Sequence, residues 1–311
     1  MLLSGPVFAA GNVLRMVTSL DPLEAAEYIK KFESDTGVKV QWIRLSSGEA
    51  LARLVSEARH PVQDVWFGAP DADFIAAREA GLLEKYSSRA TEQIASKWKD
   101  PDGYWTGIYF GTIAFAVRNG TKIPKSWQDL LDPEFKGEIE ISYPYTAGTG
   151  YAILAGLVSL MGEEKALDYY QKLDAQLRRY TKSGSSPVID VGLGEANVGI
   201  VFAQDAMRKG VARGFPIVIR HPDDGVIYEI GGTAIIKGGN KAIAGRFIDW
   251  ITSLSAQNMM QKWYRTPLHP RAGLNPVSTP INKFKFVNMD FNLAGSQRER
   301  LIKIWRERVG K

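Results

Sequence analysis

Short strand-like runs alternate with amphipathic helical segments through the first part of the chain. A β-prone run at residues 13–19 precedes the helical sequence PLEAAEYIKKFESDTG, in which Pro22 suits the first turn and Gly37 suits the end. Two further strand–helix pairs follow, and the third helix is predicted over residues 70–86. Strands that alternate with helices of this length form βαβ units around a parallel sheet. The pattern predicts an α/β fold.

The alternation stops and then restarts, which indicates two lobes. Residues 108–117 are rich in aromatic and β-branched side chains and predict a long strand that crosses between the lobes. A chain of 311 residues is long enough for about two domains. We expect residues 11–112 and 232–275 to form the first lobe, and residues 113–231 and 276–311 to form the second. Open α/β sheets bind ligands at the carboxyl ends of their strands, so a ligand cleft is expected between the lobes.

Glycines in the crossing segments predict where the lobes move. Residues 111–114 and 229–233 contain Gly111, Gly231 and Gly232. A few residues at the ends of such elements absorb the backbone rotation of a closing cleft. We therefore expect hinge motion at these two places.

Composition excludes several classes of protein. The net charge of +5 comes from scattered basic residues, which favours small anionic solutes and argues against a nucleic-acid partner. The absence of cysteine excludes disulfides, thiolate metal sites and cysteine nucleophiles. His60, His221 and His269 each precede a proline and lack a second histidine at metal-ligand spacing. The motif GxSxG is absent, so no catalytic residue, metal or cofactor is predicted.

The first ten residues favour export. The sequence MLLSGPVFAA resembles the second half of a secretory signal peptide with small residues at its end, although no Lys or Arg precedes Arg15. A wrongly assigned start or a tail is the alternative. No later segment approaches the roughly 18 uninterrupted apolar residues of a membrane span. We expect a soluble protein.

Two turns rich in glycine and hydroxyl residues each open a predicted helix after a strand. One contains Thr146, Gly148, Thr149 and Gly150, and the other contains Ser46, Ser47 and Gly48. Such helix starts present unpaired backbone N–H groups and the positive end of the helix dipole to an anion. Either turn alone is equally consistent with helix capping, but two that face one cleft favour an anion site. Neither matches GxxxxGK[ST] or GxGxxG, which disfavours nucleotides. In the second helix Glu49 and Arg53 are predicted to pair.

The motifs TAGTGY, GEANVGIVFAQDA, YEIGGTAIIKGG and FIDWITSLSAQ occur in this order along the chain. With them the chain resembles the periplasmic solute-binding proteins of bacterial ABC importers with the type II fold. It is most similar to their ferric-binding-protein-like branch, which also holds binders of phosphonates and sugar phosphates. The resemblance implies two lobes, each a mixed sheet flanked by helices, that close on one small solute. It also implies a periplasmic protein, here expected as a monomer, that delivers its solute to a transmembrane permease.

The resemblance also implies where a ferric member would bind iron. Such members use a histidine after the first strand, an acid after the third, and adjacent tyrosines after a later strand, at the place where this chain has VFAQDA. Those places hold Asp21, Ala69, and Gln204 with Asp205. Ferric iron needs hard anionic oxygen ligands, so the usual iron set is incomplete. The adjacent tyrosines at 169–170 lie inside a helix and are expected to pack in the core.

The predicted ligand is a small solute with a phosphate or phosphonate group, such as an aminoalkylphosphonate or a sugar phosphate. The two turns would hold the oxyanion from opposite lobes, and Ser19 and Asp21 would complete the pocket. The remaining candidates are Gln204 and Asp205 for the rest of the solute, Tyr109, Trp105 and Trp66 for the walls, and Ser183. Ser183 is the weakest, because hydroxyl clusters in loops usually satisfy local turns.

Other functions remain open on the sequence. An amine on the solute would pair with Asp21 or Asp205, whereas a sugar would donate hydroxyl hydrogens to them. A ferric binder that holds iron through an external anion or chelate is the alternative within the same class. An α/β phosphatase or transferase with the same turns, or a periplasmic sensor, is the alternative outside it.

Overall fold

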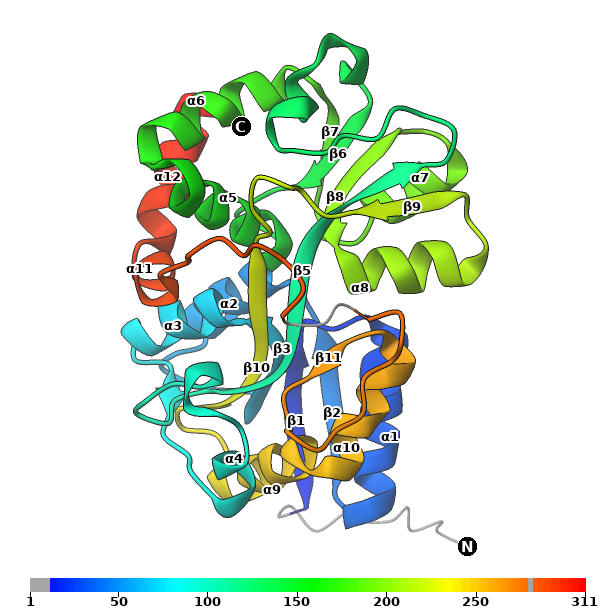
Figure 1. The fold of residues 1–311 in the computed structure, drawn as a ribbon. Helices are drawn as coiled ribbons and strands as arrows, with labels where there is room; N and C mark the ends of the chain where they lie inside the picture. The colour runs from blue at the N-terminus through cyan, green and yellow to red at the C-terminus, as the bar shows by residue number, and fades with distance from the viewer. Residues whose placement is uncertain (1–11, 279–281) are drawn as a thin grey trace, which may run out of the picture.

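The computed structural model describes residues 12–278 and 282–311, in two lobes stacked on one another (Figure 1). The expected signal segment at residues 1–10 lies outside these ranges. The strands are β1 Val13–Thr18, β2 Lys39–Arg44, β3 Val65–Pro70, β4 Leu83–Glu84, β5 Thr106–Arg118, β6 Ile139–Ser142, β7 Leu177–Thr181, β8 Val198–Phe202, β9 Ile217–Arg220, β10 Tyr228–Ile236 and β11 Thr266–Pro267. The helices are α1 Pro22–Thr36, α2 Ser47–Ser56, α3 Asp71–Glu79, α4 Arg89–Glu92, α5 Gly148–Met161, α6 Glu163–Asp174, α7 Pro187–Leu193, α8 Ala203–Asp205, α9 Lys241–Thr252, α10 Leu254–Met259, α11 Phe291–Ser296 and α12 Arg298–Val309.

The strands follow the order β2-β1-β3-β10-β5-β8-β6-β7. In the first lobe β1 is parallel to β2 and β3, and in the second lobe β6 is parallel to β7 and β8. The strands β10 and β5 run antiparallel to their neighbours, so both sheets are mixed. Helices flank each sheet (Figure 1). The predicted α/β fold with two mixed sheets is confirmed.

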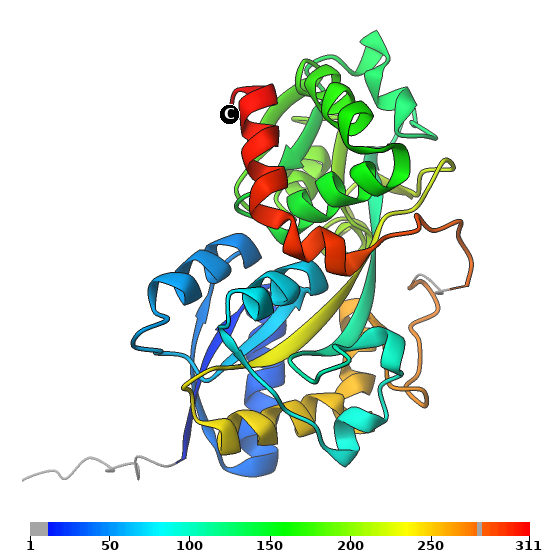
Figure 2. The ribbon, with the colours of Figure 1, turned by 90° about the vertical axis from the view of Figure 1, so that its left-hand side faces the viewer.

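The long strand β5 joins the lobes. Residues 106–112 pair with β10, and residues 113–117 pair with β8. The division expected between residues 112 and 113 therefore falls within β5, and the one expected after residue 231 falls within β10. The C-terminal segment also spans both lobes, because α11 packs on α3 while α12 packs on α5 and α6 (Figure 2).

Each lobe has its own apolar core. In the first, the rings of Phe32 and Phe67 meet Phe247 of α9 edge-on, with centroids 5.2 and 5.1 Å away. In the second, the fully buried Trp127 meets Phe115 of β5. The tyrosines at 169–170 are buried in this second core, where they were predicted to pack.

Local sequence signals explain how the helices of the first lobe begin and end. The Asp21 side chain accepts the Leu23 N–H and caps α1, which ends at Gly37 with φ 71°. The third helix was predicted to reach Tyr86 but stops at Glu79, because Gly81 takes the left-handed conformation with φ 68°.

The predicted pair of Glu49 and Arg53 does not form. The Glu49 carboxylate instead accepts the Ser46 N–H at 3.2 Å, which completes a capping box at the start of α2. Arg53 pairs with Glu57, one turn further along the helix, at 2.7 Å.

The glycines of the expected hinge are explained by close packing. None of the three has a positive φ. A Cβ at Gly231 would collide with the ring of Tyr109, and one at Gly111 would lie 2.7 Å from the Gln204 amide nitrogen. Hinge motion at these strands stays a prediction.

Asp71 links α3 to the crossing strand β10. The carboxylate accepts the Ala72 N–H at 2.8 Å and the Ile230 N–H at 3.3 Å. Burial raises the pKa of Asp71 to about 8, because desolvation outweighs these two hydrogen bonds. The folded protein therefore retains at neutral pH a proton that the unfolded chain releases above about pH 4.

Because folded Asp71 retains this proton, the effect of Asp71→Asn on the free energy of unfolding should depend on pH. The contribution of Asp71 to the free energy of unfolding should fall as pH rises from about 4 to about 8, because the unfolded chain binds fewer protons. The neutral amide has no such dependence. The stability of the variant relative to the parent should rise by about 1–3 kcal/mol between about pH 5.5 and 7.5 in urea denaturation. Parallel pH profiles of the two proteins would contradict this.

Candidate functional site

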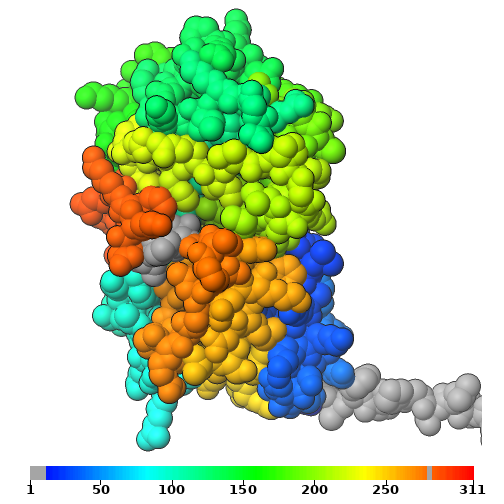
Figure 3. Space-filling view, turned by 45° about the vertical axis from the view of Figure 1, so that its right-hand side comes forward, coloured from blue at the N-terminus to red at the C-terminus, as the bar shows by residue number. Residues whose placement is uncertain are grey.

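A cavity of about 60 Å³ lies between the lobes, where β1, β2 and β3 end and α5 begins. The second lobe lies directly on the first along a narrow seam in the space-filling view (Figure 3). Among the residues predicted from the sequence, the cavity is lined by Ser19, Asp21, Ser46, Ser47, Tyr109, Gly148, Thr149, Ser183, Gln204 and Asp205. The two helix starts therefore face the same space, one from each lobe.

Three residues of the two predicted turns do not line this cavity. The Thr146 hydroxyl donates to the Lys182 carbonyl at 2.9 Å, so it is already used by a hydrogen bond to the loop after β7. The Gly48 N–H donates across the seam to the Thr146 carbonyl at 3.2 Å, so this N–H is not available to bind an anion. At Gly150 a Cβ would lie 2.5 Å from the Ser142 carbonyl oxygen, so this glycine serves the tight turn from β6 into α5.

The start of α5 is left without a cap. Its N-cap residue is Ala147, which offers no side-chain hydrogen bond, and the Tyr151 N–H is the one that bonds the Ala147 carbonyl. The N–H groups of residues 148–150 therefore have no acceptor within the helix. With the dipole of a 14-residue helix behind them, they favour an anion. The capping explanation that the sequence left open does not apply to this turn.

The start of α2 is different. The capping box of Ser46 and Glu49 satisfies this helix terminus, so capping explains a large part of its sequence. What α2 brings to the cavity are hydroxyl groups, those of Ser46 and Ser47. The first lobe thus contributes side chains, whereas the second contributes the free backbone N–H groups of α5.

Arg44, at the end of β2, is a cavity residue that the sequence analysis missed. Its Nε donates to the Leu20 carbonyl at 3.3 Å and its Nη1 to the Ser46 hydroxyl at 3.2 Å. Within residues 12–278 and 282–311, no carboxylate forms an ion pair with Arg44. A cation at the carboxyl end of a parallel strand is a signal that could have found it.

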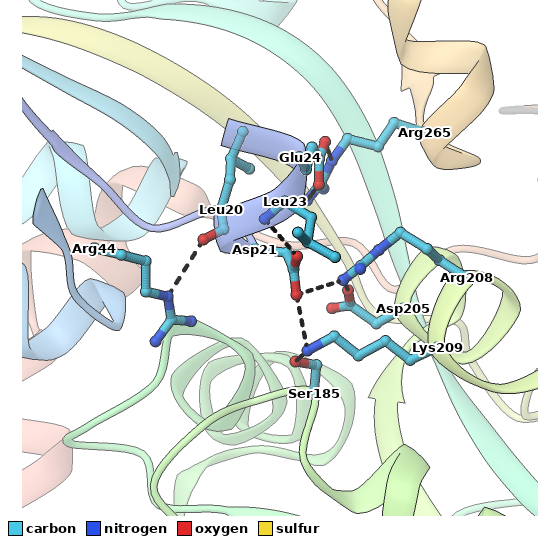
Figure 4. A network of polar contacts seen from close by, with 10 residues as sticks. All are labelled: Leu20, Asp21, Leu23, Glu24, Arg44, Ser185, Asp205, Arg208, Lys209 and Arg265. Carbon is cyan, nitrogen blue, oxygen red and sulfur yellow. Dashed lines mark hydrogen bonds and ion pairs between the residues drawn. The ribbon is translucent and has the colours of Figure 1, made fainter. Parts of the chain in front are cut away.

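Ion pairs cross the seam beside the cavity (Figure 4). Asp21 Oδ2 lies 3.2 Å from Arg208 Nη2 and 3.1 Å from Lys209 Nζ, which come from the other lobe. Lys209 also donates to the Ser185 hydroxyl at 2.7 Å, and Arg208 pairs with Asp205 at 3.2 Å. Burial opposes the charge of Asp21, but the two cations outweigh it and lower its pKa.

A second ion pair underlies the cavity floor. Arg265 Nη2 lies 3.0 Å from Glu24 Oε2, with both side chains almost fully buried. The guanidinium stacks 4.0 Å from the centre of the Tyr109 ring, and the Tyr109 hydroxyl donates to the Gly68 carbonyl. This pairing neutralises Arg265 and fixes the Tyr109 wall.

Two buried polar groups at the cavity lack partners among the described residues. These are Gln204 Nε2 and Glu229 Oε2. Burial raises the pKa of Glu229 well above its usual value, because desolvation disfavours the charged carboxylate. Both side chains therefore leave a hydrogen-bonding atom available to a guest.

The two tryptophans expected in the walls lie elsewhere. Trp66 is fully buried and donates its indole N–H to the hydroxyl of Ser19, a cavity residue, at 3.2 Å. It therefore supports the cavity wall without lining it. Trp105 stacks on Phe74 in the core of the first lobe. Aromatic residues on strands are core positions more often than ligand walls, and periodicity does not distinguish the two.

The described part of the chain shows neither a metal centre nor a membrane span. It contains no group of three or more His, Asp or Glu side chains placed to hold a metal ion. His221 instead shares a hydrogen bond of 2.9 Å with the Thr112 hydroxyl. No described helix has both the length and the apolar character needed to cross a membrane.

Comparison with known proteins places this geometry in context. A family model described as "Bacterial extracellular solute-binding protein" matches residues 70–293. An uncharacterized protein of Haemophilus influenzae is 36% identical over 298 residues, which span 90% of this chain and 86% of that protein.

Solved structures share the fold. The periplasmic binding protein AfuA from Actinobacillus pleuropneumoniae, with exogenous fructose-6-phosphate bound, superposes with a TM-score of 0.92 at 34% identity, covering 96% of this chain and 98% of that one. A ferric binding protein from Campylobacter jejuni superposes with a TM-score of 0.83 at 24% identity, covering 95% and 99%. The latter likeness concerns the fold alone.

The tight seam predicts that Gly148→Ala separates the lobes. A Cβ at this position would lie 2.5 Å from Pro70 Cγ and 3.0 Å from the Ser47 hydroxyl, both across the seam. The radius of gyration from small-angle X-ray scattering should therefore increase relative to the parent protein. Gly214→Ala is the control, because it lies in open space and its positive φ affects stability alone. Equal radii for the parent and Gly148→Ala would contradict the described contact.

Proposed function

Because the chain belongs to the bacterial extracellular solute-binding proteins, we propose that it captures a phosphate- or phosphonate-bearing solute for an ABC importer. The cavity between the lobes is the capture site, and the permease of the importer is the partner. The protein acts in the periplasm, where AfuA, a similar protein, is found.

One observation carries the proposal: the uncapped start of α5 faces a cavity that also holds Arg44, a cation without an acidic partner among the described residues. A tetrahedral oxyanion needs several donors arranged around it. The free N–H groups of residues 148–150, the hydroxyls of Thr149 and Ser47, and the guanidinium supply them. A neutral solute would leave this charge and these donors unsatisfied.

The rest of the solute is better matched by hydroxyl groups than by an amine. Asp21 and Asp205, the candidates for an ammonium partner, already pair with Arg208 and Lys209. Burial raises the pKa of Glu229 and disfavours its charged form, and the Gln204 amide carries no charge. A sugar hydroxyl can donate to or accept from both. A sugar phosphate is therefore favoured over an aminoalkylphosphonate, in line with the fructose-6-phosphate bound to AfuA.

The alternatives have less support in the geometry. Ferric iron would need anionic oxygen ligands, but Asp21 and Asp205 are held by cations and Ala69 offers no ligand atom. A phosphatase or transferase would convert the bound solute, whereas a binding protein releases it unchanged. Recovery of intact fructose 6-phosphate after prolonged incubation separates these two classes.

The proposal predicts the effects of two substitutions on the binding of fructose 6-phosphate. Arg44→Gln and Thr149→Ala should each raise the dissociation constant about 10- to 150-fold, because each removes a hydrogen bond to a charged group. Isothermal titration calorimetry measures this directly. Thr146→Ala is the matched control, since its hydroxyl is used by the Lys182 carbonyl, and its affinity should stay within about twofold.

A ligand screen completes this test. Fructose 6-phosphate, 2-aminoethylphosphonate, inorganic phosphate and ferric citrate are compared by thermal shift. A solute at 100 times its dissociation constant stabilises the folded state by about 2.7 kcal/mol. Stabilisation by ferric citrate alone, with a charge-transfer band in the visible spectrum, would contradict the phosphate proposal and support the ferric alternative.

A further inference from the structure

The charges around the closed cavity nearly cancel. Two cations line it, and Arg265 is neutralised by Glu24, so Arg44 alone has no acidic partner among the described residues. Arg208 and Lys209 stand behind the lining and are neutralised by Asp21 and Asp205. The lining therefore offers a guest one cation, Arg44, that forms no ion pair with a described carboxylate.

Asp21 occupies the position that a second anionic group of a guest would take. The Asp21 carboxylate lines the cavity, receives a charged donor from both Arg208 and Lys209, and reaches them from the opposite lobe. Lys209 stays close to the cavity through the Ser185 hydroxyl, which is itself part of the lining. An anionic group near this position would meet the carboxylate before it met either cation.

We infer that Asp21 makes the cleft selective for solutes with a single phosphate group and an otherwise uncharged body. It does so because its ion pairs with Arg208 and Lys209 keep these cations from binding a second anionic group of the solute. This inference rests on the function proposed above and adds the charge of the solute to it. A bisphosphate would have to displace Asp21 or lie against it, and a like charge at that distance is repelled. A monophosphate needs only Arg44 and the start of α5.

Asp21→Asn isolates this role, because asparagine preserves the other task of the residue. Asp21 caps α1 by accepting the Leu23 N–H at 3.0 Å, and asparagine caps helices as well as aspartate does. The substitution removes the negative charge and leaves Lys209 and Arg208 without their cross-cleft partner. Lys209 then becomes available to a second phosphate, whereas Arg208 keeps its ion pair with Asp205.

The test compares fructose 6-phosphate with fructose 1,6-bisphosphate by isothermal titration calorimetry at low ionic strength. The parent protein should bind the monophosphate more tightly. In Asp21→Asn the affinity for the bisphosphate relative to the monophosphate should rise about tenfold or more, as expected for a new charged hydrogen bond. The ratio is used because any general weakening of lobe closure affects both ligands equally. Added salt should reduce the gain.

Two controls identify the source of the gain. The double variant Asp21→Asn/Lys209→Met removes the freed cation and should lose most of the gain. Asp290→Asn makes the same change at the cap of α11, remote from the cavity lining, and should leave the ratio at the parent value.

The possible outcomes distinguish the role of Asp21 in selectivity from phosphate binding itself. A parent protein that binds the bisphosphate as tightly as the monophosphate overturns the inference, and so does an unchanged ratio in Asp21→Asn. Both results leave phosphate binding intact. A parent protein that binds neither ligand overturns the proposed function and the inference together.

Discussion

The described arrangement depends on a close approach between the two lobes at the start of α5. Gly148 lies against Pro70, and the Gly48 N–H bonds the Thr146 carbonyl, so the backbones of opposite lobes touch without intervening side chains. This approach brings an uncapped helix start to the carboxyl ends of β1, β2 and β3. Without it, the free N–H groups of α5 would face water and the cleft would lose its anion donors.

Charge pairing then determines what the cleft can accept. Most charged groups near the cavity are paired with a partner inside the protein, as Glu24 is with Arg265 and Asp21 is with Lys209. Paired charges contribute shape and neutral hydrogen bonding rather than net attraction. The proposed selectivity for one oxyanion and a hydroxyl-bearing body follows from this pairing. The presence of donors alone would not produce it.

The sequence was informative where a signal is local. Strand–helix alternation predicted the fold, and the glycine-rich turn before α5 predicted a helix start at the cleft, because both depend on neighbouring residues. It could not separate Thr149 from Thr146, since that distinction depends on the distant Lys182 carbonyl. The cations that reach Asp21 were missed for the same reason. Contacts between residues far apart in the sequence produce no periodic pattern in it.

The central claim is that a phosphate group sits at the start of α5 beside Arg44. A crystal structure of the protein grown with fructose 6-phosphate tests it most directly. The account predicts phosphate oxygens within hydrogen-bond distance of the N–H groups of residues 148–150 and of the Arg44 guanidinium. A phosphate bound elsewhere in the cleft, or a cleft that holds iron and no sugar phosphate, would contradict it.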